Sequence, residues 1–259
     1  MIKVGTSGYS YEDWRGAFYP ERLPPSRMLE FYTRHFEAVE LNSPFYRIPE
    51  PRMMEAIVRK AGGRVEFAVK ANQNLTHVRE GTASALPLFR EALRPLEEAA
   101  ALGCVLAQFP YSFRNVPENW EHLLRLKEGL ASVPLVVEFR HRGWIREEIF
   151  RLLMEHAIGF CSVDEPKLPN LPPPVVKATS RIGYVRFHGR NQASWWEHKE
   201  AWERYDYLYS EEELREWIPR IKTLAQTSEK CFVFFNNHPK GQAIQNAQMM
   251  IRLLAERGG

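Results

Sequence analysis

Short runs of apolar and β-branched residues recur along the whole chain and alternate with stretches that repeat at helical spacing. The strand-like runs occupy residues 2–7, 38–42, 65–70, 104–109, 135–140, 159–164, 183–188 and 231–236. Amphipathic helical patterns occupy residues 25–36, 85–102, 120–130, 146–156 and 241–255. Eight strands joined by helices predict a parallel sheet, and eight such strands close naturally into a barrel. We therefore predict an α/β fold, the (β/α)8 TIM barrel.

An open, doubly wound sheet is the alternative. It is disfavoured because the first strand leads into GTSGYS (5–10), which lacks the G-x-G-x-x-G turn expected in such folds. The length of 259 residues matches one barrel, so we predict a single domain over residues 1–259. Two segments interrupt the alternation. The proline-rich residues 166–174 predict a stiff surface loop, and residues 191–209, after the seventh strand, form an insertion crowded with Trp and Tyr.

Polar residues end nearly every predicted strand, and the alternation of side chains along a strand decides where they point. Glu40 shares a face with Ala38, while Val39 and Leu41 take the opposite face. In a barrel the apolar face meets the helices, so the polar face looks into the C-terminal mouth, where barrel enzymes carry their sites. The same parity argument directs inward the residues Asn42, Lys70, Gln108, Glu138, Arg140, Asp164, Arg186, His188 and Asn236.

Composition and charge narrow the picture only a little. Hydrophobic residues make up 44% of the chain and charged residues 26%, which is typical of globular proteins. The formal net charge of +3 permits an anionic partner without requiring one. The N-terminus has no signal-like segment and no apolar run approaches bilayer length, so we expect a soluble, cytoplasmic protein with no membrane partner. The three cysteines lie far apart in strand-like runs and form no CxxC pair, which favours buried thiols over a zinc site.

The predicted ring of strand ends combines acids, cations and one imidazole. The candidate catalytic residues are Glu40, Lys70, Glu138, Asp164 and His188. Histidine beside a carboxylate is suited to proton transfer near neutral pH, and Gly189 directly after His188 leaves room at the mouth. Lys70, beside carboxylates, is predicted to stay protonated and to hold an anion. Any single charge in such a ring can equally belong to a salt-bridge network.

Two other kinds of chemistry fit parts of the ring. Carboxylates and histidine at successive strand ends are also the ligands of divalent-metal barrel enzymes, but Lys70, Arg140 and Arg186 already balance the acids. No cofactor is therefore predicted, and a divalent metal is kept as the less favoured alternative. Glu40 and Glu138 could also act as a glycosidase pair. The aromatic residues near the mouth suit sugar faces or nucleobases, or simply pack loops onto the rim: Tyr9, Trp14, Phe45, Tyr46 and Trp195.

Ordered sequence blocks along the chain carry a family resemblance. They are GTSGYSYEDWRGAFYP (5–20), FEAVELNSPFYRIP (36–49), FAVKANQNLTH (67–77), LAQFPYSF (106–113), EFRHRGW (138–144), YVRFHGR (184–190) and FFNNHPKGQAIQNA (234–247). Together they resemble the YecE-like family (domain of unknown function, number 72). The resemblance implies a (β/α)8 barrel and adds Ser7, Thr76, His77 and Asn237 to the residues of interest. It implies no established reaction, and fold analogy cannot supply one.

The leading hypothesis is an enzyme that acts on a small anionic substrate, phosphate-bearing or sugar-like, by acid/base chemistry in the mouth. Lys70, Arg140 and Arg186 would hold the anion, and Glu138 or Glu40 with His188 would transfer protons. The predicted substrate-binding residues are Ser7, Tyr9, Trp14, Asn42, Tyr46, His77, Gln108, Arg140, Arg186, Asn236 and Asn237. The alternatives are a nucleic-acid-binding protein and a metal-dependent hydrolase resembling endonucleases or isomerases. Substrate, reaction and oligomeric state stay open.

Overall fold

Eight parallel strands pair in chain order, and β8 pairs with β1, so the sheet closes into a barrel. The computed structural model describes residues 1–256. The strands are β1 (Ile2–Ser7), β2 (Ala38–Leu41), β3 (Glu66–Lys70), β4 (Leu102–Gln108), β5 (Leu135–Glu138), β6 (Gly159–Asp164), β7 (Ile182–Phe187) and β8 (Lys230–Phe235). The (β/α)8 barrel predicted from the sequence is confirmed.

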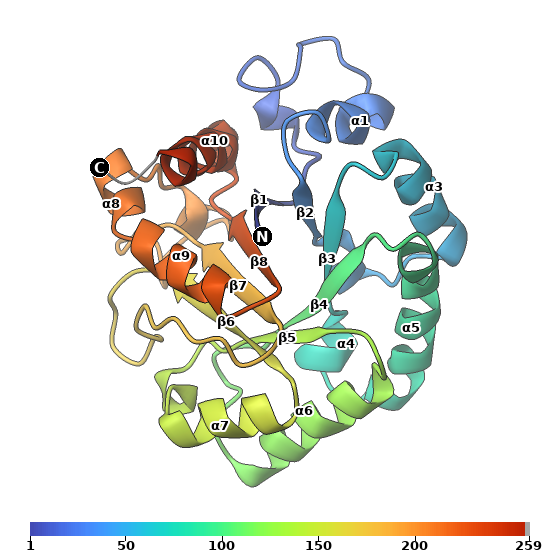
Figure 1. Ribbon diagram of the computed structural model, residues 1–259, viewed down its shortest axis with the longest axis vertical. Helices are drawn as coiled ribbons and strands as arrows, with labels where there is room; N and C mark the ends of the chain where they lie inside the picture. The colour runs from blue at the N-terminus through green and yellow to red at the C-terminus, as the bar shows by residue number, and fades with distance from the viewer. Residues whose placement is uncertain (257–259) are drawn as a thin grey trace.

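Helices form a ring outside the strands (Figure 1). The longer ones are α3 (Pro51–Ala61), α5 (Thr82–Glu98), α6 (Pro117–Gly129), α7 (Glu147–Glu155), α9 (Ile218–Gln226) and α10 (Gln242–Ala255). The short ones are α1 (Met28–Tyr32), α2 (Ser43–Tyr46), α4 (Gln73–Thr76) and α8 (Glu211–Arg215), with 3-10 turns at Glu12–Trp14, Pro25–Arg27, Arg142–Trp144, Glu203–Tyr205 and Pro239–Gly241.

The predicted helices differ from the observed ones mainly at their ends. The helix predicted over 85–102 ends at Glu98, because residues 99–101 turn the chain and Leu102 already belongs to β4. The helix predicted over 25–36 is shorter, since a 3-10 turn precedes α1. Helices α3 and α9 were not predicted, although each has a proline in its first turn, which is a common start signal.

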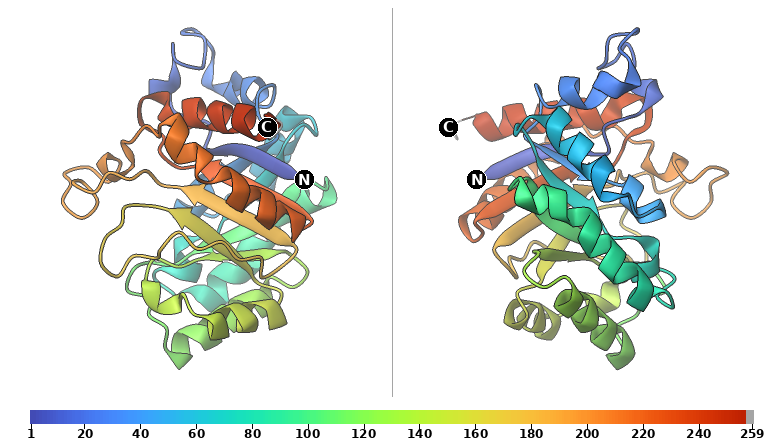
Figure 2. Two further views of the ribbon diagram at one scale, coloured as in Figure 1. Left: turned by 60° about the vertical axis from the view of Figure 1, so that its left-hand side comes forward. Right: turned by 90° about the vertical axis from the view of Figure 1, so that its right-hand side faces the viewer.

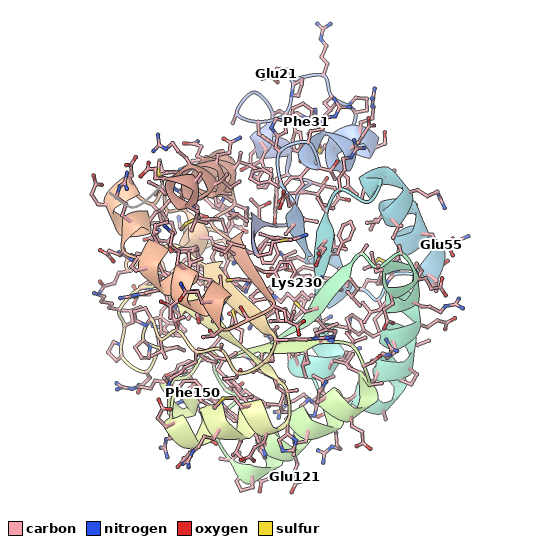
Figure 3. The ribbon with its side chains drawn as sticks, in the orientation of Figure 1. Glu21, Phe31, Glu55, Glu121, Phe150 and Lys230 are labelled. Carbon is pink, nitrogen blue, oxygen red and sulfur yellow. The ribbon has the colours of Figure 1, made fainter. Side chains whose placement is uncertain are left out.

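The core has two concentric parts. Inside the barrel lie small and medium side chains together with three rings, namely Ala38, Ala68, Cys104, Leu106, Val136, Cys161, Val163, Ile182, Tyr184, Phe232 and Phe234. A larger cluster fills the space between strands and helices. Figure 3 shows the side chains filling the centre of the ring, while the labelled Glu55 and Glu121 point outward from the rim. All three cysteines are free and buried.

Two irregular segments follow β6 and β7. Residues 165–181 contain the proline-rich stretch and form no helix or strand. Residues 188–210 contain a single 3-10 turn, Glu203–Tyr205, and extend beyond the end of β7 (Figure 2). Within residues 1–256, no helix combines the length and the hydropathy needed to cross a bilayer.

Candidate active site

A buried network of side chains centred on an arginine closes the bottom of the C-terminal mouth. It is here called the floor and comprises Ser7, Glu40, Glu138, Tyr184 and Arg186. Arg186, on β7, bonds Glu138 Oε2 through Nη1 and Glu40 Oε1 through Nη2, both at 2.7 Å. Tyr184, two residues earlier on the same face, donates its hydroxyl to the other Glu40 oxygen at 2.7 Å. The Ser7 hydroxyl accepts a longer bond from Arg186 Nη2, 3.3 Å. All these side chains are buried, so the parity argument directed Glu40, Glu138 and Arg186 inward correctly, and Ser7, which the family resemblance added, lies beside them.

His188 is held as a neutral imidazole. Its Nε2 lies 3.1 Å from Glu138 Oε1, and its Nδ1 lies 3.1 Å from the Asn236 side-chain nitrogen. An amide nitrogen donates, so Nδ1 accepts and Nε2 carries the proton given to Glu138. Burial, helped by the positive charge of Arg140, lowers the pKa of His188 to about 3. Both nitrogens are engaged, so His188 is not the titrating proton shuttle that the sequence predicted.

Glu165 is a buried carboxyl group that the sequence analysis did not identify. Arg140 pairs with Glu138 (Nε to Oε1, 2.5 Å) and reaches Glu165 Oε2 with Nη1 at 3.3 Å. Burial raises the pKa of Glu165 to about 8, against the lowering effect of Arg140. Glu165 is therefore mostly protonated at neutral pH, and Arg140 is neutralised chiefly by Glu138.

Asp164 does not point into the mouth, so its predicted position was wrong. On β6 the interior positions belong to Cys161 and Val163, which places Asp164 on the outer face. There it accepts bonds from Arg190 (2.9 and 2.8 Å), from the Tyr209 hydroxyl (2.8 Å) and from Trp217 Nε1 (2.7 Å). These bonds tie the segment after β7, and the chain beyond it, to the barrel. The inward position falls to the next residue, Glu165.

Lys70, at the end of β3, is a cation without a carboxylate partner. No acceptor within residues 1–256 bonds its ammonium group, which lies 4.1 Å from the centre of the Phe45 ring. Burial, with a contribution from the positive Arg186, lowers the pKa of Lys70 to about 7. Lys70 is therefore protonated in only part of the molecules near neutral pH, rather than in all of them as predicted. A lysine with this pKa can both hold an anion and exchange a proton.

Short helices after β2 and β3 position further mouth residues. Phe45 and Tyr46 end α2, and His77 caps α4. The Asn72 side chain links the two helices: its oxygen accepts from the Asn74 amide (3.1 Å), and its nitrogen donates to the Pro44 carbonyl (2.8 Å). The Thr76 hydroxyl lies 2.9 Å from His77 Nδ1 and orients that ring.

Two cavities open above the floor. The first, about 290 Å³ and here called the aromatic cavity, is lined by Phe45, Lys70, His77, Gln108, Pro110, Tyr111, Arg140, Leu171, Trp195, Trp196, Arg204 and Tyr205. The second, about 260 Å³ and here called the polar cavity, is lined by Tyr11, Asn42, Tyr46, Lys70, Gln108, Arg140, Arg186, Tyr205, Asn236 and His238. Within the described chain, neither lining includes Glu40, Glu138 or His188, which lie beneath.

The segment after β7 covers the mouth and contributes Trp195, Trp196 and Tyr205. It leaves the barrel at Gly189, whose φ of +90° lies in the left-handed region. A Cβ atom there would come within 2.8 Å of the Tyr207 Cβ atom, so the turn requires glycine. The aromatic residues of 191–209, which the sequence marked as an insertion, thus supply a wall of the cavities.

Four predicted substrate-binding residues do not line either cavity: Ser7, which belongs to the floor, and Tyr9, Trp14 and Asn237. Trp14 is fully buried and donates its indole N–H to the His238 carbonyl at 2.8 Å. Tyr9 packs near Tyr32, with ring centres 6.3 Å apart. Asn237 bonds the Tyr207 carbonyl and the Asn246 side chain, both at 2.8 Å. These last three residues hold loops on the rim of the barrel. The other predicted binding residues line a cavity.

Some residues of the site were missed. Tyr184 shares the parity of Arg186 and His188, so the alternation on β7 could have identified it. Glu165 could not be found that way, because it follows a strand whose two faces are both buried. Arg204, Tyr11 and His238 reach the cavities from loops, where spacing in the sequence gives no direction.

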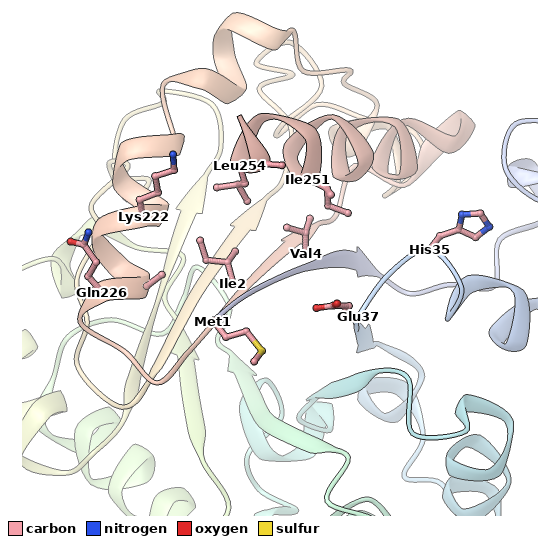
Figure 4. A pocket seen from close by; sticks show the side chains of 11 residues that line it. Met1, Ile2, Val4, His35, Glu37, Lys222, Gln226, Ile251 and Leu254 are labelled. Atoms are coloured by element: carbon pink, nitrogen blue, oxygen red, sulfur yellow. The ribbon is translucent and has the colours of Figure 1, made fainter. Parts of the chain in front are cut away.

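A cavity at the opposite end of the barrel is larger, about 660 Å³, and lies between β1, α9 and α10 (Figure 4). Its walls are mainly aliphatic, including Ile2, Val4, Ile251 and Leu254. It lies at the N-terminal ends of the strands, where barrels carry stability rather than catalysis. We therefore assign the site to the mouth despite the smaller volumes there.

The donor set of the mouth does not fit a divalent metal. Within the described part of the chain, no three His, Cys, Asp or Glu side chains gather in an arrangement that could hold an ion. Glu40 and Glu138, the buried acids of the floor, are both bonded to Arg186. A cation there would have to displace a guanidinium group.

The fold and site define a (β/α)8 barrel protein with a buried ion-pair floor beneath a two-cavity mouth. The chain belongs to the family described as "Protein of unknown function DUF72", whose family model matches residues 3–259. The resemblance seen in the sequence blocks is thereby confirmed.

Relatives cover the chain from end to end. UPF0759 protein YunF of Bacillus subtilis is 31% identical over an alignment of 274 positions, which covers 98% of this chain and 95% of that protein. A crystal structure of a DUF72 family protein from Thermotoga maritima is 44% identical with a TM-score of 0.91, covering 99% of this chain and 100% of that one. A DUF72 family protein from Enterococcus faecalis is 25% identical with a TM-score of 0.88, covering 100% and 97%. The structure of SacUVDE, 11% identical with a TM-score of 0.51 and covering 98% and 97%, is similar in fold alone.

Proposed function

We propose that this protein is an enzyme that binds a small, phosphate-bearing anion in the barrel mouth and acts on it by acid/base chemistry centred on Lys70. One observation carries the proposal: the Lys70 ammonium group faces both cavities and bonds no carboxylate within residues 1–256. A partly buried, unpaired cation is costly, so proteins keep one where a ligand supplies the counter-charge.

The charges of the site support an anionic ligand. Glu40 and Glu138 offset Arg186 and Arg140 through direct ion pairs. Because burial raises the pKa of Glu165 to about 8, that carboxyl adds little negative charge at neutral pH. Protonated Lys70, together with Arg204 in the lining of the aromatic cavity, then leaves the mouth with excess positive charge, which an anion would neutralise.

The roles follow from what each side chain can reach. Lys70, with Arg140 beside it, would contact the anion, and its pKa of about 7 suits it to give or take a proton at neutral pH. Glu138 and Glu40 would orient the two arginines. His188 would fix Glu138 by donating its Nε2 proton. The proton-transfer role expected earlier for Glu138 or Glu40 with His188 therefore passes to Lys70.

Replacing Lys70 tests the proposal directly. In calorimetric titrations with glucose 6-phosphate and glucose 1-phosphate, we expect the wild-type protein to bind at least one compound and Lys70→Met to weaken that binding about tenfold or more, the typical value of a buried charge-assisted bond. Lys167→Met removes an equal charge from the exposed proline-rich loop and should bind as the wild type does. Equal binding by the wild type and Lys70→Met, or no binding of any phosphorylated compound, would overturn the proposal.

Anion affinity should fall as pH rises. Below about pH 7 Lys70 is charged and Glu165 neutral; above about pH 8 Lys70 is neutral and Glu165 anionic, so two proton losses each lower the positive charge of the mouth. Inorganic sulfate keeps its charge over this range and is the suitable probe. We expect its affinity to drop roughly tenfold per pH unit for each linked proton. In Lys70→Met the loss of sulfate affinity linked to Lys70, which begins near pH 7, should be absent. The loss linked to Glu165, which begins near pH 8, should remain. A flat profile in the wild type would contradict this assignment.

A further inference from the structure

The two cavities of the mouth meet over a shared cationic centre. Lys70, Gln108, Arg140 and Tyr205 line both the aromatic and the polar cavity. Lys70 and Arg140 thus lie at the junction. Each cavity has one further arginine: Arg204 lines the aromatic cavity, and Arg186, already paired with Glu40 and Glu138, lines the polar cavity. A substrate with its anionic group at one tip would leave one cavity empty.

The walls on the two sides of this junction differ in chemistry. The aromatic cavity presents the rings of Phe45, Tyr111, Trp195 and Trp196; the rings of Tyr111 and Trp196 lie 5.3 Å apart, and Trp196 is 51% exposed. Such rings stack on flat aromatic groups.

The polar cavity presents groups that form hydrogen bonds. Its wall includes the amides Asn42 and Asn236 and the phenol of Tyr46, which is 73% exposed. The Asn42 side-chain oxygen is buried and bonds no group in residues 1–256. Amides and phenols with unused hydrogen-bonding groups match a ligand rich in hydroxyl groups, because each unpaired buried polar atom gains a hydrogen-bond partner.

Size points the same way. Each cavity alone falls just below the range of about 300–1,000 Å³ typical of small-molecule sites, whereas the two together lie within it. Either cavity alone accommodates only part of a typical ligand.

Building on the proposed function, we infer that the substrate is a phosphate diester or diphosphate whose anionic centre joins a flat ring to a hydroxyl-rich group, as in a nucleoside diphosphate sugar. The phosphates would lie over Lys70 and Arg140. The flat ring would enter the aromatic cavity against Trp196, and the hydroxyl-rich group would enter the polar cavity beside Asn42 and Tyr46. Each half contributes contacts, and the link between them makes the second contact intramolecular.

Calorimetric titration of whole probes against their halves tests this inference. The whole probes are UDP-glucose and ADP-ribose, and the halves are UMP, AMP, glucose 1-phosphate and ribose 5-phosphate. We expect at least one whole probe to bind about tenfold or more tighter than either of its halves. If every half binds as tightly as the whole, the inference fails while the proposed function stands. If no phosphorylated compound binds, both fail.

Two exposed residues provide matched variants that leave the floor intact. Trp196→Ala should weaken the nucleotide half and the whole probe while leaving the sugar phosphate unchanged. Tyr46→Ala should weaken the sugar phosphate and the whole probe while leaving the nucleotide unchanged. Equal effects of each variant on both halves would overturn the assignment of the cavities. Tighter binding of a single-stranded oligonucleotide than of every small probe, falling steeply with salt, would instead identify the ligand as nucleic acid and overturn the inference.

Discussion

Replacing Arg186 with methionine is expected to lower the free energy of unfolding by about 3–5 kcal/mol, because it leaves the buried Glu40 without a cation and leaves Glu138 with Arg140 alone. Glu40 and Glu138 are fully buried, and each bonds Arg186 at 2.7 Å. Methionine fills much of the same volume but offers no donors, so Glu40 must stay charged at high cost or take up a proton. Urea denaturation at pH 7, followed by circular dichroism, measures the loss.

Two further variants separate the buried network from a general effect of removing arginine. Arg215 pairs with Glu211 and Glu256 on the surface, so Arg215→Met should cost no more than about 1 kcal/mol. Combining Arg186→Met with Glu40→Gln removes the stranded charge, leaves the Glu138–Arg140 pair in place, and should recover a substantial part of the lost stability. A cost of under about 1 kcal/mol for Arg186→Met alone would show that the floor is not a coupled ion network.

Much of this floor could be predicted from the sequence, because the strands that carry it alternate cleanly. On β2 and β7 the interior residues end in Glu40 and Arg186, while Val39 and Val185 pack toward the helices. The period of two then fixes the direction of every side chain once one face is assigned. The partnership itself could not be predicted, since 146 positions separate Glu40 from Arg186 and only barrel closure brings them together.

Strand β6 shows where the same argument fails. Its sequence, GFCSVD, is buried on both faces, so apolar residues do not distinguish the interior from the helix side. The polar residue at the end of this strand was therefore predicted to point inward. Asp164 instead points outward, where it bonds Arg190 and Trp217. Desolvation cannot be predicted from the sequence either, because the pKa values of Lys70 and Glu165 depend on how many atoms surround each group in the fold.

Replacing Lys70 with methionine should make the protein more stable even as it weakens ligand binding. Lys70 is partly buried and has no carboxylate partner in residues 1–256, and desolvation lowers its pKa from 10.5 to about 7. The unfolded chain solvates that charge freely, so the folded state bears a penalty that methionine removes. We expect a gain of about 1–2 kcal/mol, the size found when a strained functional residue is replaced. The corresponding rise in Tm is roughly 2–8 °C.

The pH dependence of this gain identifies its cause. A lysine whose folded pKa lies below its unfolded value destabilises the fold fully below about pH 7, and the penalty fades as pH rises toward 10.5, where both states are neutral. The difference in Tm between Lys70→Met and the wild type should thus be largest near pH 6 and shrink by pH 9, while Glu165 cancels because both proteins contain it. Thermal melts at these two pH values decide the matter. A gain independent of pH would reflect better packing instead, and a loss of stability at pH 6 would mean that Lys70 is a structural cation rather than one kept for a ligand.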